Sequence, residues 1–186
     1  RFQAVSDLKI APDGSTAFED VAAARASAEN TAATGGAVAD SLSAQAGAMQ
    51  RATSELQQAF KPAEPLICYS IKTNPNIHIA RLMGDFGSGF DVTSGGELYR
   101  ALAAGGTGPR IVFAGVGKTD AELRYGLDSN VTLFNVESEA ELEVLSEVAS
   151  AMGEIAPVSV RVNPNVDPKT HPYISTGLKG NKFGIA

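Results

Sequence analysis

The sequence has little of several residue types on which particular functions depend. Its 186 residues include one cysteine and no tryptophan, and 15 basic side chains stand against 21 acidic ones. A single cysteine excludes an internal disulfide and a metal site built from clustered cysteines, so we expect no metal. A net charge of −6 leaves no basic patch for a phosphate backbone, so we expect no nucleic-acid partner.

Long apolar runs are also missing. No run approaches the roughly 20 residues that a membrane-spanning helix needs, and the first residues lack the basic-then-apolar pattern of a secretory signal. We therefore expect a soluble, cytoplasmic protein without a membrane partner. A hydrophobic content of 44% is enough for one ordinary domain with a sizeable core.

Residues 1–60 differ from the rest because they are rich in alanine, with frequent glycine and serine. The stretch 16–19 (Thr-Ala-Phe-Glu) fits a capping box, which predicts a helix that starts at Ala17. We expect this helix to end at the Gly35-Gly36 pair and a second helix to cover 38–60. The predicted organisation is an N-terminal helical segment, 1–60, followed by an α/β domain, 61–186.

From residue 66 onward, short apolar runs alternate with helical patterns. The expected strands are 66–71, 90–92, 111–114, 131–136 and 158–162, and the expected helices are 75–86, 95–104, 120–127 and a helix after Ser138. Three of these helices follow Ser/Thr-x-x-Glu signatures: Ser94 with Glu97, Thr119 with Glu122, and Ser138 with Glu141. The repeat of strand and helix predicts parallel strands joined by right-handed crossovers.

Polar side chains cluster where successive strands end. They are Lys72, Asn74, Asp91, Ser94, Lys118, Glu137, Arg161 and Asn163. Convergence from many strand ends is typical of the mouth of a (β/α) barrel. An open doubly wound sheet is the alternative, but no G-x-G-x-x-G follows the first strand. We therefore predict a TIM-type barrel, incomplete because about five units fit where eight are needed.

Lys72 follows the apolar run 66–71, at the end of a strand where α/β proteins bind ligands. Burial would favour the neutral amine, which can form a Schiff base with an aldehyde. The alternative is a structural lysine whose ammonium reaches water at the barrel rim. Cys68, inside the same strand, is interpreted as a small core thiol.

Several motifs together resemble a known family, the pyridoxal-phosphate-dependent decarboxylases of fold type III. The motifs are Tyr-Ser-Ile-Lys-Thr-Asn at 69–74, Gly-Ser-Gly-Phe-Asp-Val-Thr-Ser-Gly-Gly-Glu-Leu at 87–98, Asn-Val-Glu-Ser-Glu-Ala-Glu-Leu at 135–142 and Arg-Val-Asn-Pro at 161–164. The stretches 170–177 (Thr-His-Pro-Tyr-Ile-Ser-Thr-Gly) and 181–185 are similar to the diaminopimelate branch in particular. The likeness runs from 66 to 185 and implies an alanine racemase-like barrel.

The resemblance implies roles for four residues. Lys72 is implied to be the catalytic lysine that forms a Schiff base with the cofactor, pyridoxal 5'-phosphate. Asp91 and Arg161 are implied to lie near the cofactor ring, and His171 to border the substrate side. Structural alternatives remain open: Asp91 as a strand end, Arg161 as the ion-pair partner of Glu137, and His171 as a surface residue. Glu97 is interpreted as the closing residue of its capping box.

The implied activity is decarboxylation of an amino acid, meso-diaminopimelate to L-lysine, by an enzyme of lysine biosynthesis that is a homodimer. The alternatives are a non-catalytic barrel that binds pyridoxal phosphate, an inactive fragment, or a decarboxylase of ornithine, arginine or carboxynorspermidine. The family's enzymes are far longer, and their glycine-rich phosphate loop, ring-nitrogen glutamate and catalytic cysteine have no counterpart here. We therefore interpret the chain as a truncated form whose open strand edges favour self-association.

Overall fold

The computed structural model describes residues 18–166 and 183–185. The chain divides into two compact units, Arg1–Met49 and Gln50–Ala186. The boundary between them falls within the first helix, α1 (Phe18–Ala59). None of the described helices is long and apolar enough to cross a membrane.

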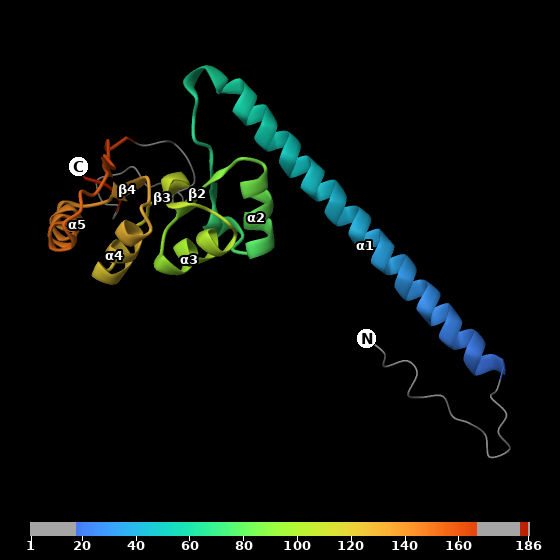
Figure 1. Ribbon diagram of the computed structural model, residues 1–186. Helices are drawn as coiled ribbons and strands as arrows, with labels where there is room; N and C mark the ends of the chain where they lie inside the picture. The colour runs from blue at the N-terminus through green and yellow to red at the C-terminus, as the bar shows by residue number, and fades with distance from the viewer. Residues whose placement is uncertain (1–17, 167–182, 186) are drawn as a thin grey trace, which may run out of the picture. The chain divides into compact units, whose positions relative to one another are not determined.

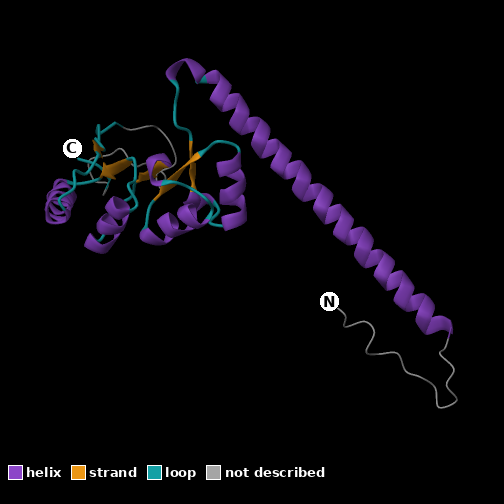
Figure 2. Ribbon diagram, viewed as in Figure 1, coloured by secondary structure: helices purple, strands orange, loops and turns teal. Residues whose placement is uncertain are grey.

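Strands and helices alternate through the second unit (Figures 1 and 2). In order they are β1 (Cys68–Ser70), α2 (Ile77–Asp85), β2 (Gly89–Val92), α3 (Gly95–Ala103), β3 (Ile111–Phe113), α4 (Asp120–Asp128), β4 (Leu133–Val136), α5 (Glu139–Met152) and β5 (Val158–Val160). Short 3₁₀ turns, η1 (Lys61–Ala63), η2 (Ile71–Thr73) and η3 (Gly108–Arg110), precede or follow strands. The predicted strand-and-helix repeat is confirmed: β2 begins one residue earlier than predicted, and each of the other strands is one to three residues shorter.

All pairings in the five-stranded sheet are parallel, and the strand order is β1-β2-β3-β4-β5. A doubly wound sheet reverses its strand order at a switch point, whereas a barrel adds each strand next to the last. The observed order therefore agrees with the predicted α/β barrel winding. A further parallel bridge joins Val162 to Ile185, just beyond β5.

The core lies between the sheet and the helices α2 to α5. Buried residues alternate with partly exposed ones along β3, β4 and the last three residues of β2, so one face of each strand packs against the helices. Phe90, Phe113 and Phe134 are all at most 2% exposed, and the last two rings stack with centroids 5.9 Å apart. Two valines of β5, Val158 and Val160, are 41% and 46% exposed, and β5 is the last strand of the sheet among the described residues.

The predicted break at Gly35-Gly36 is wrong, because α1 runs through both glycines without interruption. A glycine in a helix interior costs about 1 kcal/mol relative to alanine, which weakens a helix without ending it. Alanines surround the pair and no proline follows it before Pro62. The predicted capping box at 16–19 lies partly outside the described residues.

Three of the predicted caps, Ser94, Thr119 and Ser138, do cap their helices, but two of the three matching glutamates have other partners. The Thr119–Glu122 pair forms a reciprocal box. Glu97 instead accepts hydrogen bonds from the backbone N and the Oγ1 of Thr93, at 2.7 and 3.0 Å. Glu141 accepts one from a buried lysine on another element. The interpretation of Glu97 as the closing residue of its box is therefore wrong by one position.

The last turns of α1 belong to the second unit. Thr53 is 5% exposed, and Gln57 donates from Nε2 to the backbone oxygen of Phe86 at 2.9 Å. These contacts fix the lead-in to β1. The division of the chain at residue 60 stays a prediction.

Candidate functional site

A cavity of about 310 Å³ opens at the carboxyl ends of the strands. It is lined in part by Lys72, Asp91, Thr93, Glu137, Arg161 and Phe183. Three of the four predicted site residues, which are up to 89 positions apart in the sequence, therefore share one cavity. The fourth, His171, lies outside the described residues.

Lys72 is held at the mouth by the turn that follows β1. It is the middle residue of η2, and the preceding Ile71 is completely buried beneath the sheet's end. Thr73 closes the turn by donating from Oγ1 to the backbone oxygen of Ser70 at 2.6 Å. The predicted position of Lys72 at the carboxyl end of a strand is confirmed. Its side chain is exposed in the part of the chain that the structure describes, which agrees with the alternative of a lysine whose ammonium reaches water at the rim.

Asp91 sits beside the end of β1, because the register pairs it with Ser70. Ser70 donates from Oγ to Asp91 Oδ2 at 3.0 Å, which fixes one oxygen of a carboxylate that lines the cavity. Asp91 also affects Cys68: burial raises the pKa of that thiol, and the negative charge of Asp91 raises it further, against a smaller lowering by Arg110. Cys68 is half-buried, so it agrees with a packing role and has no activated thiolate.

Arg161 and Glu137 form an ion pair in the wall of the same cavity. Arg161 Nη1 donates to both carboxylate oxygens of Glu137, at 3.0 and 3.2 Å. Glu137 is 3% exposed, whereas the side chain of Arg161 is 40% exposed. The guanidinium also lies 4.9 Å from the ring centroid of Phe183. Arg161 is therefore the ion-pair partner of Glu137, which was its structural alternative. The same residue also lines the cavity.

Lys118, another polar residue predicted near the mouth, is locked into the scaffold. Its side chain is 1% exposed, and Nζ donates to the backbone oxygens of Gly115 and Asn135 at 2.7 and 2.8 Å. The third partner is Glu141 Oε1 at 2.6 Å. All three ammonium hydrogens are therefore engaged, so Lys118 holds the loop after β3 against β4 and α5. Among the described residues, Lys72 is the lysine that lines the cavity.

A hydrogen bond joins the starts of α3 and α4. Glu122 Oε1 accepts from the backbone N of Gly95 at 2.8 Å, and Oε2 accepts from Thr119 N at 3.0 Å. These backbone hydrogen bonds, Gly95 first, hold the pKa of Glu122 below its usual value, against a smaller opposing effect of burial. The capping-box pattern predicted the hydrogen bond between Glu122 and Thr119. Nothing in the sequence predicted the one between Glu122 and Gly95, which is 27 positions away.

The cavity lining fits part of a pyridoxal phosphate molecule. A reachable lysine amine can condense with an aldehyde, and an arginine and an aspartate beside it can face a polar aromatic ring. A cavity of about 310 Å³ is within the usual size of small-molecule sites. Within 18–166 and 183–185, no group of three or more His, Cys, Asp or Glu residues is arranged to hold a metal ion.

Comparison with known proteins identifies a family for most of the chain. The family described as pyridoxal-dependent decarboxylase, pyridoxal binding domain, matches residues 46–186. The match therefore includes the last turns of α1 and every residue of the cavity.

Two curated relatives show how specific the similarity is. The chain is 52% identical over 139 residues to diaminopimelate decarboxylase of Neisseria meningitidis serogroup B, which covers 75% of this chain and 34% of that protein. It is 53% identical over 130 residues to the Aquifex aeolicus protein of the same name, which covers 69% of this chain and 31% of that protein. The chain thus spans about a third of the length of these relatives.

Solved structures of two diaminopimelate decarboxylases are also similar to this chain. Diaminopimelate decarboxylase from Helicobacter pylori, complexed with L-lysine, superposes with a TM-score of 0.71 at 48% identity, over 73% of this chain and 34% of that one. The enzyme from M. jannaschii, also with L-lysine, gives a TM-score of 0.65 at 44% identity, over 73% and 33% of the two chains.

Proposed function

Because the chain belongs to the pyridoxal-dependent decarboxylase family, we propose that it is the lysine-bearing part of an enzyme that decarboxylates meso-diaminopimelate to L-lysine. The observation that carries the proposal is the cavity in which Lys72, Asp91 and Arg161 meet at the carboxyl ends of parallel strands. Support for the substrate comes from relatives that are about half identical and named for it. The whole enzyme would be a cytoplasmic homodimer.

The cofactor of this reaction is pyridoxal phosphate, and Lys72 would hold it through its aldehyde carbon, with Asp91 and Arg161 beside its ring. When bound, it supplies an electron sink for the pair of electrons that remains after carbon dioxide leaves. His171 would border the substrate side. The roles of Lys72, Asp91 and Arg161 rest on the shared cavity and on the matching motifs, and that of His171 rests on the motif alone.

The protein groups contribute position and charge. Ile71, buried below the mouth, fixes the backbone that carries Lys72, so the amine moves only by its own side-chain torsions. Ser70 orients the Asp91 carboxylate, and Glu137 holds the Arg161 cation on the wall of the cavity. A prearranged set of charges at the reacting centre lowers the cost of orienting groups in the transition state.

The described residues do not include every group that the reaction needs. The cavity lining offers one exposed lysine and one arginine, and we assign no phosphate anchor or ring-nitrogen partner within 18–166 and 183–185. The chain also spans only about a third of its relatives. We therefore assign catalysis to the longer enzyme, and to this chain the attachment of the cofactor.

Borohydride trapping tests the attachment. The purified chain is mixed with pyridoxal phosphate, reduced, digested and mapped by mass spectrometry. The expected result is a label on Lys72, loss of that label in Lys72→Ala, and full labelling in Lys61→Ala, which removes an exposed lysine of η1. A label that falls mainly on another lysine would defeat the assignment.

Release of carbon dioxide separates the enzyme from a barrel that only binds the cofactor. Labelled meso-diaminopimelate is added to the chain and to a version extended to the length of its relatives. The proposed function predicts release by the extended protein that disappears in Lys72→Ala. Labelling of Lys72 without release by the extended protein would favour the non-catalytic alternative.

A further inference from the structure

Thr93, the first residue after β2, lines the cavity that contains Lys72. Its backbone N and its Oγ1 both donate to one carboxylate oxygen, Oε2 of Glu97, at 2.7 and 3.0 Å. Glu97 does not belong to the lining that the described residues form, so these contacts pass its effect on the cavity through Thr93.

Glu97 is a well-anchored partner for Thr93, because it lies in the first turn of α3. The next residue, Leu98, is completely buried, and so is Ala101 one turn later. The N-cap, Ser94, accepts a hydrogen bond from the backbone N of Glu97 at 3.3 Å. The backbone that carries the carboxylate is therefore fixed to the core, and the carboxylate can move only through the torsions of its own side chain.

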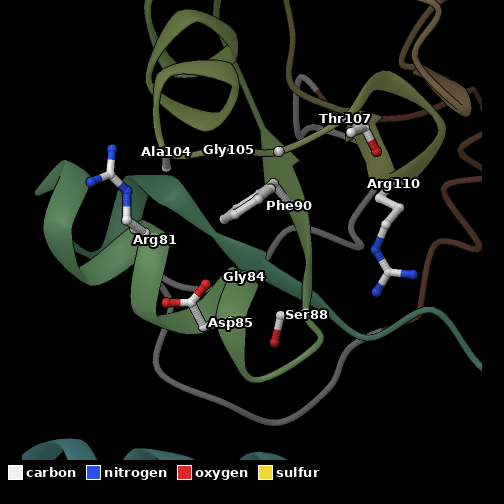
Figure 3. A pocket seen from close by; sticks show the side chains of 10 residues that line it. Arg81, Gly84, Asp85, Ser88, Phe90, Ala104, Gly105, Thr107 and Arg110 are labelled. Atoms are coloured by element: carbon white, nitrogen blue, oxygen red, sulfur yellow. The ribbon is translucent and has the colours of Figure 1, made fainter.

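The strand that leads to Thr93 is fixed upstream by the ring of Phe90. This residue is 2% exposed, and Figure 3 shows its ring between α2 and the loop that follows α3. A Cβ placed on Gly106 would lie 2.8 Å from the ring, so the ring fills the available space. Val92, directly before Thr93, is completely buried. Thr93 is therefore the point at which a rigid strand meets the cavity, and the hydrogen bonds to Glu97 fix its orientation there.

Thr93 also packs against the loop that follows β3. A Cβ placed on Gly115 would lie 3.1 Å from the Cβ of Thr93 and 3.2 Å from its backbone oxygen. Beside this contact, the backbone N of Ala114 donates to the oxygen of Val92 at 2.8 Å. Ala114 and Gly115 line the same cavity as Thr93. A shift of Thr93 would therefore displace a second part of the lining as well.

We propose that Glu97 is a positioning residue of the Lys72 cavity. Its carboxylate holds Thr93, and Thr93 packs on Gly115, so that the wall between the ends of β2 and β3 keeps the shape that receives pyridoxal phosphate. The inference rests on the proposed function, because that function makes pyridoxal phosphate the ligand of this cavity. A misplacement of about 1 Å at a site can cost about 100-fold in rate, so we expect loss of both bonds to Thr93 to weaken attachment about ten-fold.

Borohydride trapping at a series of pyridoxal phosphate concentrations measures this effect. The fraction of Lys72 that carries the label, determined by mass spectrometry, gives the concentration for half-maximal labelling. All chains are compared at a temperature at which circular dichroism shows each of them folded. Glu97→Ala should raise the half-maximal concentration about ten-fold. An unchanged half-maximal concentration would overturn the proposal.

Two smaller changes at Glu97 separate its reach from its charge. Glu97→Gln keeps the length of the side chain and one oxygen that can accept from Thr93, so labelling should stay within about three-fold of the wild type. Glu97→Asp keeps the charge but withdraws the carboxylate by one carbon, so it should weaken labelling almost as much as Glu97→Ala, and it keeps the test decisive if Glu97→Ala does not fold. The reverse order, with Glu97→Asp like the wild type and Glu97→Gln impaired, would show that charge and not position matters.

Glu122→Ala is the matched control for a loss of stability. Glu122 Oε2 accepts from the backbone N and the Oγ1 of Thr119 at 3.0 and 2.9 Å, the same arrangement one helix later, and neither residue is in the cavity lining. Glu122 also accepts from the backbone N of Gly95, so its loss should lower the melting temperature at least as much as Glu97→Ala does. Labelling of Lys72 should nevertheless be unchanged. An equal loss of labelling in both variants would assign the effect to stability and overturn the proposal.

A ¹⁵N–¹H NMR comparison without any cofactor distinguishes a failure of this inference from a failure of the proposed function. In Glu97→Ala, the amide of Thr93 should exchange its hydrogen faster and the amide of Gly115 should shift, while the amide of Gly153, at the end of α5, stays unchanged. Absence of label on Lys72 in the wild-type chain would defeat the proposed function. Amides of Thr93 and Gly115 that are the same in Glu97→Ala as in the wild type would defeat the positioning role, whatever the labelling shows.

Discussion

A single nitrogen of Arg161, Nη1, lies 3.0 and 3.2 Å from the two carboxylate oxygens of Glu137, and the two residues differ sharply in exposure. Glu137 is 3% exposed and Arg161 is 40% exposed in their side chains. Loss of the arginine would leave a buried charge without its partner, whereas loss of the glutamate would leave a cation that water can solvate. The two halves of this pair are therefore unequal in their effect on stability.

We expect Arg161→Met to lower the free energy of unfolding by about 3 kcal/mol, and Glu137→Gln to lower it by about 1 kcal/mol. Urea unfolding followed by circular dichroism measures both. The double variant should be more stable than Arg161→Met alone, because the buried charge is then gone. Equal losses in the two single variants would contradict the asymmetry.

Lys118→Met should destabilise the chain by about 3–5 kcal/mol, because Glu141 loses its buried partner and two backbone oxygens lose a donor. Unfolding in urea gives the value. Adding Glu141→Leu should recover part of the loss, and Lys61→Met, at an exposed site, should change stability by less than about 0.5 kcal/mol. A Lys118→Met chain as stable as the wild type would show that this network contributes nothing.

The lowered pKa of Glu122 predicts a specific dependence of stability on pH. Its pKa is depressed in the folded chain by the backbone N–H groups of Gly95 and Thr119. The stabilisation is therefore fully present above the ordinary pKa of a glutamate and is lost as the pH falls through the depressed folded value. Melting temperatures measured from pH 7 down to pH 3 should fall less steeply for Glu122→Gln than for the wild type. Glu147→Gln, on an exposed site of α5, serves as the control; identical slopes for wild type and Glu122→Gln would refute the assignment.

Alanine substitutions at Gly115 and Gly117, in the loop at the mouth of the cavity, measure the effects of backbone strain and of steric contact separately. Both have positive φ, +91° and +70°, but a Cβ on Gly115 would lie 3.1 Å from Thr93 Cβ, while one on Gly117 meets nothing within 4 Å. Alanine at Gly117 should cost about 1 kcal/mol from strain alone. Alanine at Gly115 should cost more and also weaken labelling of Lys72, since Gly115 lines the cavity. Thermal melts and the trapping assay measure the two effects, and equal effects of the two variants would disprove the steric contribution.

Much of the fold could be predicted because its signals are local. Short apolar runs with turn residues between them mark strands wherever they occur, and Ser94, Thr119 and Ser138 cap their helices through bonds that span three residues. The position of Lys72 at a strand end followed from the same pattern. Its exposure did not, because burial depends on neighbours that the local sequence does not name.

The sequence by itself determined the order of parallel strands and helices, the helix starts and the lysine at the end of the first strand. Tertiary structure decided which partner each charged side chain takes: Glu97 bonds to Thr93, Glu141 to Lys118 and Glu122 to Gly95. It also brought Lys72, Asp91 and Arg161 into one cavity. The physical reason is that strand and cap signals act over a few residues, whereas ion pairs, cavities and burial arise between elements that only packing brings together.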